Sequence, residues 1–233
     1  MTSPSAPQPT AQTECSQPPA ARTFPVHHHP TSSSPDPQLR LETLLVRSGT
    51  GTDPATGAIT TPIHLSTAYG HPGLGESTGY DYTRTASPTR DVLQDALARL
   101  EGGTAAFALS SGMAALELVT RTLAPHGSRI VALRDLYGGS FRFLEVLAEE
   151  GAARVDFVLG IEGLRGALAD PADLVIIETP TNPMMEEISI PEAAELAHTA
   201  GARLVVDNTF YTPVVQRPLE LGADVVVHSG TKY

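Results

Sequence analysis

Residues 203–228, "RLVVDNTFYTPVVQRPLELGADVVVH", contain two short apolar runs, and each run ends at a polar residue, Asp207 or His228. Short, unbroken apolar runs rich in β-branched residues are typical of strands that are buried on both faces, as in parallel sheets. The same pattern recurs upstream and alternates with amphipathic segments of helical spacing. The sequence therefore predicts an α/β fold with a mostly parallel sheet and helices on both of its faces.

The expected strands cover residues 105–109, 129–133, 154–159, 173–179, 203–207 and 224–228. The expected helices cover 88–100, 113–124, 141–151, 162–168 and 191–201. The first of these helices has a clear start, because Ser87 is a favoured cap residue and Pro88 suits the first helical position.

The composition changes along the chain in a way that predicts three parts. Residues 1–40 are rich in Pro and Ser and poor in aliphatic residues, which is typical of a disordered tail. Residues 41–88 begin with a short apolar stripe and continue without periodicity, so we expect an extended arm. Residues 89–233 carry the regular pattern and form the main domain.

Charge and cysteine content exclude several classes of protein. The chain has 233 residues and a net charge of −11, with scattered basic residues, so we expect no nucleic-acid partner and no membrane partner. The single cysteine, Cys15, favours a reducing cytoplasm. His27, His28 and His29 are adjacent and lack acidic or thiol partners, which indicates a solvated run rather than a metal site.

In parallel α/β sheets, ligands bind outside the carboxyl ends of the strands. "SSGM" at 110–113 opens a helix and is suited either to an anion or simply to capping. Asp207 at a strand end needs a protonated ring nitrogen, a metal or a helix cap as its partner, and metal is disfavoured because Glu178 is the only other strand-end carboxylate. Lys232 is suited to form a Schiff base if it is desolvated, although a solvated lysine is the alternative.

A phosphate site, an imine-forming lysine, an acid for a pyridine nitrogen and a tyrosine that can stack on a ring are together the parts of a pyridoxal phosphate site. The chain indeed resembles the Cys/Met-metabolism family of pyridoxal-phosphate enzymes over roughly residues 41–233. The resemblance is carried by the following motifs: "YDYTRTASPT", "LEGG", "SSGMAA", "DLYGGSFR", "ETPTNP" and "VVDNTFYTPVVQRPLELGADVVVHSGTKY". It implies the aspartate-aminotransferase-like fold (fold type I).

The resemblance also assigns roles to individual residues. Lys232 would bind the cofactor and move protons, and Tyr137 would stack on its ring and assist in proton transfer. Asp207 would pair with the pyridine N–H, and Asn182 would donate to the ring hydroxyl oxygen. The phosphate would be held by the backbone of Gly112 and Met113, the hydroxyls of Ser229 and Thr231, and, from a neighbouring subunit, Tyr82 and Arg84. A homodimer or homotetramer is therefore implied, and no metal is expected.

The implied activity is γ-replacement on an O-acyl-homoserine by cysteine or sulfide, as in the cystathionine γ-synthase and O-acetylhomoserine thiolyase branch, with cystathionine β- or γ-lyase as the alternative. Gly139 stands where methionine γ-lyases have cysteine, which disfavours that activity. The family also has a second half whose arginine binds the substrate carboxylate. We therefore expect the N-terminal part of an active enzyme or, alternatively, a truncated inactive chain that only assembles with intact subunits.

Overall fold

A computed structural model describes residues 39–50, 53 and 55–232 of the chain. The expected disordered tail and its histidines lie outside the described residues, except for Leu39 and Arg40. The described residues fall within one compact unit. No helix in this described part is both long enough and apolar enough to span a bilayer.

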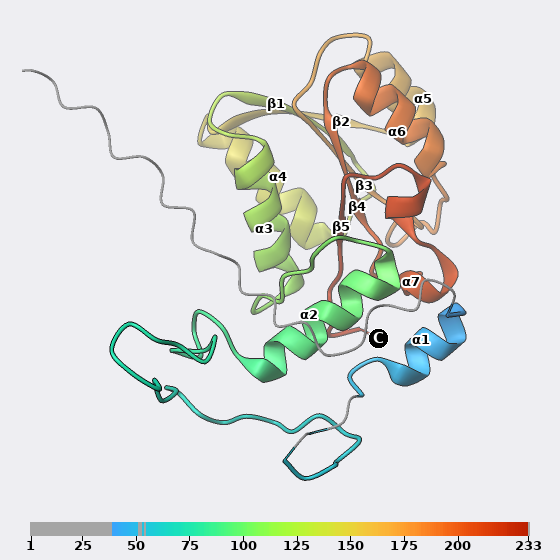
Figure 1. Ribbon diagram of the computed structural model, residues 1–233. Helices are drawn as coiled ribbons and strands as arrows, with labels where there is room; N and C mark the ends of the chain where they lie inside the picture. The colour runs from blue at the N-terminus through green and yellow to red at the C-terminus, as the bar shows by residue number, and fades with distance from the viewer. Residues whose placement is uncertain (1–38, 51–52, 54, 233) are drawn as a thin grey trace, which may run out of the picture. The chain divides into compact units, whose positions relative to one another are not determined.

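Five strands form one parallel sheet in the order β2-β1-β3-β4-β5 (Figure 1). The strands are β1 (Ser128–Leu133), β2 (Ala153–Val158), β3 (Leu174–Glu178), β4 (Arg203–Asp207) and β5 (Val225–Val227). All residues of β3 are buried, as expected for a central strand covered on both faces. The predicted α/β class and parallel sheet are thus confirmed.

Four helices cover the two faces of the sheet: α3 (Gly112–Leu123), α4 (Gly138–Glu149), α5 (Gly160–Ala167) and α6 (Ile190–Thr199). Figure 1 shows α3 and α4 on one face and α5 and α6 on the other. For α4, α5 and α6, which connect strands, this division follows from handedness, because right-handed connections that run in opposite directions along a sheet place their helices on opposite faces. The chain moves outward from β1 to β2 through α4 and returns past β1 to β3 through α5.

Two helices precede this sheet in the chain, α1 (Leu41–Arg47) and α2 (Pro88–Glu101). Pro88 is the first residue of α2, as predicted, and Gly102 ends the helix with a φ of 71°. Between α1 and α2 the described residues form no helix or strand, and Ile63 and Leu65 are 77% and 89% exposed. After β4, a short helix α7 (Thr212–Val215) and a 3-10 helix η1 (Pro218–Leu221) lead to β5.

The strand expected at residues 105–109 is wrong. This segment has no strand partner among the described residues, and its backbone is bonded differently, because Ala108 N–H donates to the side-chain Oε1 of Gln94 at 2.9 Å. Phe107 and Leu109 remain 68% and 39% exposed. An apolar run becomes a strand only where a neighbouring strand satisfies its backbone groups.

The core predicts a clear difference between two leucine substitutions. Leu204 in β4 is fully buried, so Leu204→Ala should lower the free energy of unfolding by about 3 kcal/mol through lost burial and a residual cavity. Leu118 in α3 is 48% exposed, and Leu118→Ala should cost well under half of that. Urea denaturation of both variants measures the difference, and equal losses would contradict the assigned core.

Candidate functional site

The carboxyl ends of β3, β4 and β5 meet at one edge of the sheet. The register pairs Glu178 with Asp207 and Asp207 with Val227. His228 and the residues that follow it therefore leave β5 beside Asp207. The parallel pairing brings the predicted acid and the predicted lysine-bearing turn to the same edge.

Asp207 is half-buried, and its Oδ1 accepts two hydrogen bonds from Thr209. The backbone N–H of Thr209 lies at 3.0 Å and its hydroxyl at 2.6 Å. The Thr209 hydroxyl in turn accepts the backbone N–H of Ser229 at 2.8 Å. Thr209 thus joins the end of β4 to the turn after β5. Thr209 was not among the predicted site residues, although a hydroxyl two residues after an aspartate is a known signal for such a local turn.

The turn after β5 holds its own polar side chains together. Ser229 Oγ and Thr231 Oγ1 are 3.1 Å apart, and Lys232 Nζ donates to Thr231 Oγ1 at 3.3 Å. Lys232 is exposed, so the described residues do not supply the desolvation expected from its strand-end position. The hydrogen bonds nevertheless connect Asp207 to Lys232 through Thr209, Ser229 and Thr231.

The N-terminus of α3 lies against this turn. A Cβ atom built on Gly112 would be 2.8 Å from Ser229 Cβ and 3.0 Å from Ser229 Cα, so a side chain there would collide with the turn. Ser111 caps the helix by accepting the backbone N–H of Ala114 at 3.1 Å. The free N–H groups of a helix N-terminus and two hydroxyls at one place suit an anion such as a phosphate.

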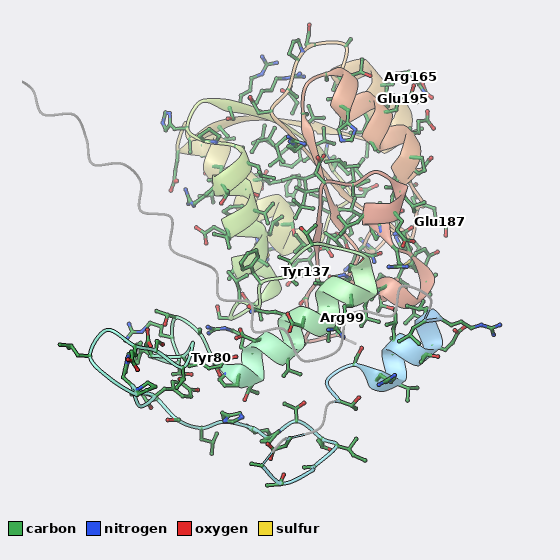
Figure 2. The ribbon with its side chains drawn as sticks, viewed as in Figure 1. Tyr80, Arg99, Tyr137, Arg165, Glu187 and Glu195 are labelled. Carbon is green, nitrogen blue, oxygen red and sulfur yellow. The ribbon has the colours of Figure 1, made fainter. Side chains whose placement is uncertain are left out.

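Tyr137 stands at the start of α4 and is 46% exposed (Figure 2). Its backbone N–H donates to Oε2 of Glu178 at 2.5 Å. A Cβ atom on Gly139 would lie 2.5 Å from Cε1 of Tyr137, so the ring occupies the space that a side chain at Gly139 would need. Glu178 was considered from the sequence only as a possible metal ligand, and its contact with Tyr137 was not predicted.

Glu178 is a buried carboxyl group, only 6% exposed. The pKa of Glu178 is raised to about 7, mainly by burial and also by the charge of Asp207, while the hydrogen bond from Tyr137 N–H acts in the opposite direction. Among the described residues, no group of three or more His, Cys, Asp or Glu side chains is arranged to hold a metal ion.

A buried polar network joins the end of α2 to the residues that follow β3, β4 and β5. Glu101, at the end of α2, contacts His228 Nε2 at 2.5 Å and accepts the Asn208 amide at 3.2 Å. Asn208 is fully buried and exchanges hydrogen bonds with Gln216, whose amide also donates to the carbonyl oxygen of Thr179 at 3.1 Å. The network ties α2 to the chain segments that follow β3, β4 and β5.

The remaining predicted residues lie outside this hydrogen-bonded group. Asn182 is exposed in the turn after β3. Arg84 donates to Tyr82 Oη at 2.6 Å, and its guanidinium carbon lies 5.0 Å from the centroid of the tyrosine ring. No described hydrogen bond joins Tyr82 or Arg84 to the turn that carries Lys232.

Relatives of known activity resemble the chain closely. The cystathionine γ-synthase of Haemophilus influenzae is 47% identical over 199 residues, which cover 84% of this chain and 54% of the relative. That of Escherichia coli is 48% identical over 193 residues, covering 82% and 50%. A cystathionine γ-lyase of Bacillus subtilis is 40% identical over 197 residues, covering 84% and 52%. The chain thus spans about half the length of these relatives.

Solved structures agree with this result. The cystathionine γ-synthase of Xanthomonas oryzae pv. oryzae, solved in complex with cystathionine, has a TM-score of 0.81 and 42% identity, covering 84% of this chain and 51% of that one. The family model for Cys/Met metabolism PLP-dependent enzymes matches residues 42–233. The chain belongs to the family of Cys/Met metabolism enzymes that depend on pyridoxal phosphate.

Proposed function

We propose that the protein is a trans-sulfuration enzyme of methionine and cysteine metabolism that uses pyridoxal phosphate to replace the γ-substituent of an O-acyl-homoserine with cysteine or sulfide. The observation that carries this proposal is the set of hydrogen bonds that link Asp207, Thr209, Ser229, Thr231 and Lys232, placed against the N-terminus of α3. Relatives named cystathionine γ-synthase, at 47% and 48% identity, support the choice of reaction.

The residues present fit the phosphate of the cofactor. Gly112 lacks the Cβ that would fill the space beside Ser229, and the Ser229 and Thr231 hydroxyls adjoin each other there. In this proposal the backbone N–H groups of Gly112 and Met113 and these two hydroxyls bind the phosphate. A chain with a net charge of −11 has no general attraction for an anion, so these local donors must provide it.

The other site residues would orient the ring and move protons. Lys232 would hold the cofactor by its amine and then carry a proton to and from the substrate carbons. Asp207, whose Oδ1 is fixed by Thr209, would keep the pyridine nitrogen protonated. Tyr137 would stack on the ring, and Asn182 would bind its hydroxyl oxygen. Bound pyridoxal phosphate supplies the sink for the electron pair left on the substrate when a proton is removed.

We also propose that residues 41–88 are an arm that acts in a neighbouring subunit of a cytoplasmic homodimer or homotetramer. Ile63 and Leu65 in this segment are largely exposed, which suits a surface covered by another copy. Tyr82 and Arg84 contact each other rather than the turn of their own chain, which leaves them available for the phosphate of a partner.

Removal of the lysine tests the cofactor assignment. In the protein expressed from the complete reading frame that contains this chain, Lys232→Ala should abolish the visible absorption band of covalently held pyridoxal phosphate, because no amine remains to hold it. Lys232→Arg is the control, since it keeps the charge without that reactivity and should also lack the band. A band that persists in both variants would show that another amine holds the cofactor.

A small side chain at the phosphate site tests the close approach of α3. Gly112→Ala should weaken pyridoxal phosphate binding by about tenfold or more, because its Cβ would push α3 away from Ser229. Gly166→Ala in α5 is a matched control, because nothing lies within 4 Å of a Cβ built there. Spectroscopic titration measures both affinities, and an unaffected Gly112→Ala variant would contradict the phosphate assignment.

Substrates separate γ-replacement from the alternative lyase activity, which the 40% identical cystathionine γ-lyase of Bacillus subtilis keeps open. Incubation with O-acetylhomoserine plus cysteine should give cystathionine. A parallel incubation with cystathionine alone measures elimination. Keto-acid release from cystathionine with no synthesis in the first incubation would reject γ-replacement in favour of the lyase.

A further inference from the structure

Glu178 is a buried carboxylate at the point where the order of strands reverses. The chain leaves β1 for β2 on one side and comes back to β3 on the other, so the connections after β1 and β3 diverge here. In open α/β sheets this is the place where ligands bind. Glu178 ends β3, and Tyr137 follows β1, so their hydrogen bond bridges the two strand ends at the reversal.

Burying this carboxyl group is costly. A carboxylate taken out of water costs several kcal/mol unless donors compensate it, and the raised pKa of Glu178 reflects that cost. Asp207 lies directly beside it in the register of β3 and β4 and repels it further. An apolar side chain at this strand end would avoid both penalties. The contact that Glu178 makes with Tyr137 N–H is the compensating gain that the structure shows.

The main chain of Tyr137 determines where its ring lies. The backbone has φ −45° and ψ 131°, and its carbonyl oxygen accepts the N–H of Phe141 at 3.1 Å in the first turn of α4. The ring lies over Gly139, where a Cβ would be 2.5 Å from Cε1 and 3.1 Å from Met113 Sδ. With the carbonyl held by the helix and the N–H held by Glu178, the residue is fixed on both sides.

We propose that Glu178 is a positioning residue that holds Tyr137 by its backbone N–H, so that the tyrosine ring covers the cofactor. This inference rests on the proposed function. Glu178 acts through its acceptor oxygen and affects the cofactor only indirectly, by holding Tyr137.

Glu178→Gln and Glu178→Ala separate the acceptor from the rest of the side chain. The glutamine keeps an acceptor oxygen of the same reach, and the alanine removes it. Glu195→Ala on α6 is the control for loss of an exposed carboxylate on the other face of the sheet (Figure 2). All variants are made in the protein expressed from the complete reading frame.

The first measurement is hydrogen exchange of the Tyr137 amide without cofactor. This amide should be protected in the wild type, in Glu178→Gln and in Glu195→Ala, and should exchange about tenfold faster or more in Glu178→Ala, because its acceptor is lost. Unchanged exchange in Glu178→Ala would overturn the proposal. A general loss of stability would be recognised in two ways. It would lower the midpoint of thermal denaturation, and it would speed the exchange of amides throughout β3 and β4 as well as that of Tyr137.

The second measurement is a double-mutant cycle on the affinity for pyridoxal phosphate. Glu178→Ala should lower the affinity about tenfold and Glu178→Gln should largely restore it. In a Tyr137→Ala background, Glu178→Ala should have no further effect, because the residue it acts through has already lost its ring. Equal losses in the two backgrounds would overturn the inference while the proposed function stands. A wild-type protein that binds no pyridoxal phosphate would overturn the proposed function and this inference with it.

Discussion

Parallel pairing of β3, β4 and β5 is the constraint that creates the site. Parallel strands all end at the same edge, and the register here places Glu178, Asp207 and the start of the lysine turn at adjacent positions. Residues separated by 20 or more positions in the chain become neighbours through this pairing, as with Thr209 and Ser229. Because the sheet brings the loops after these strands together, a few hydrogen bonds between the loops are enough to hold their side chains in place.

Charge at this edge is unbalanced in a way that suits a cationic ring. Glu178 and Asp207 are adjacent carboxyl groups. The positively charged Lys232 in the turn donates a hydrogen bond to the exposed hydroxyl of Thr231 rather than to either carboxyl group. A protonated pyridine nitrogen placed at Asp207 would relieve repulsion between the two carboxylates as well as gain its own ion pair. The proposed phosphate site, by contrast, consists of backbone N–H groups and hydroxyls, which would bind an anion without buried positive charge.

Much of the fold could be predicted from sequence because its signals are local. Four of the five strands from residue 128 onward contain unbroken apolar runs, whereas Arg154 and Asp156 interrupt β2, and the strand ends mark where polar residues gather. The segment at 105–109 has the same apolar pattern, but periodicity carries no information on whether a neighbouring strand is present. Thr209 and Glu178 were missed for a similar reason, since their roles depend on partners 20 and 41 residues away. The roles of Lys232, Tyr137 and the phosphate residues remain predictions.

The buried network behind the site links parts of the chain that the sequence keeps far apart. Glu101 precedes Asn208 by 107 positions and His228 by 127, yet one carboxylate oxygen serves both. Groups that share an acceptor in this way have strongly non-additive effects when they are changed. These positions are therefore expected to vary together in evolution: a relative with a different residue at 101 needs matching changes at 208 and 228, and grafting one of these segments into another member of the family requires transfer of its partners.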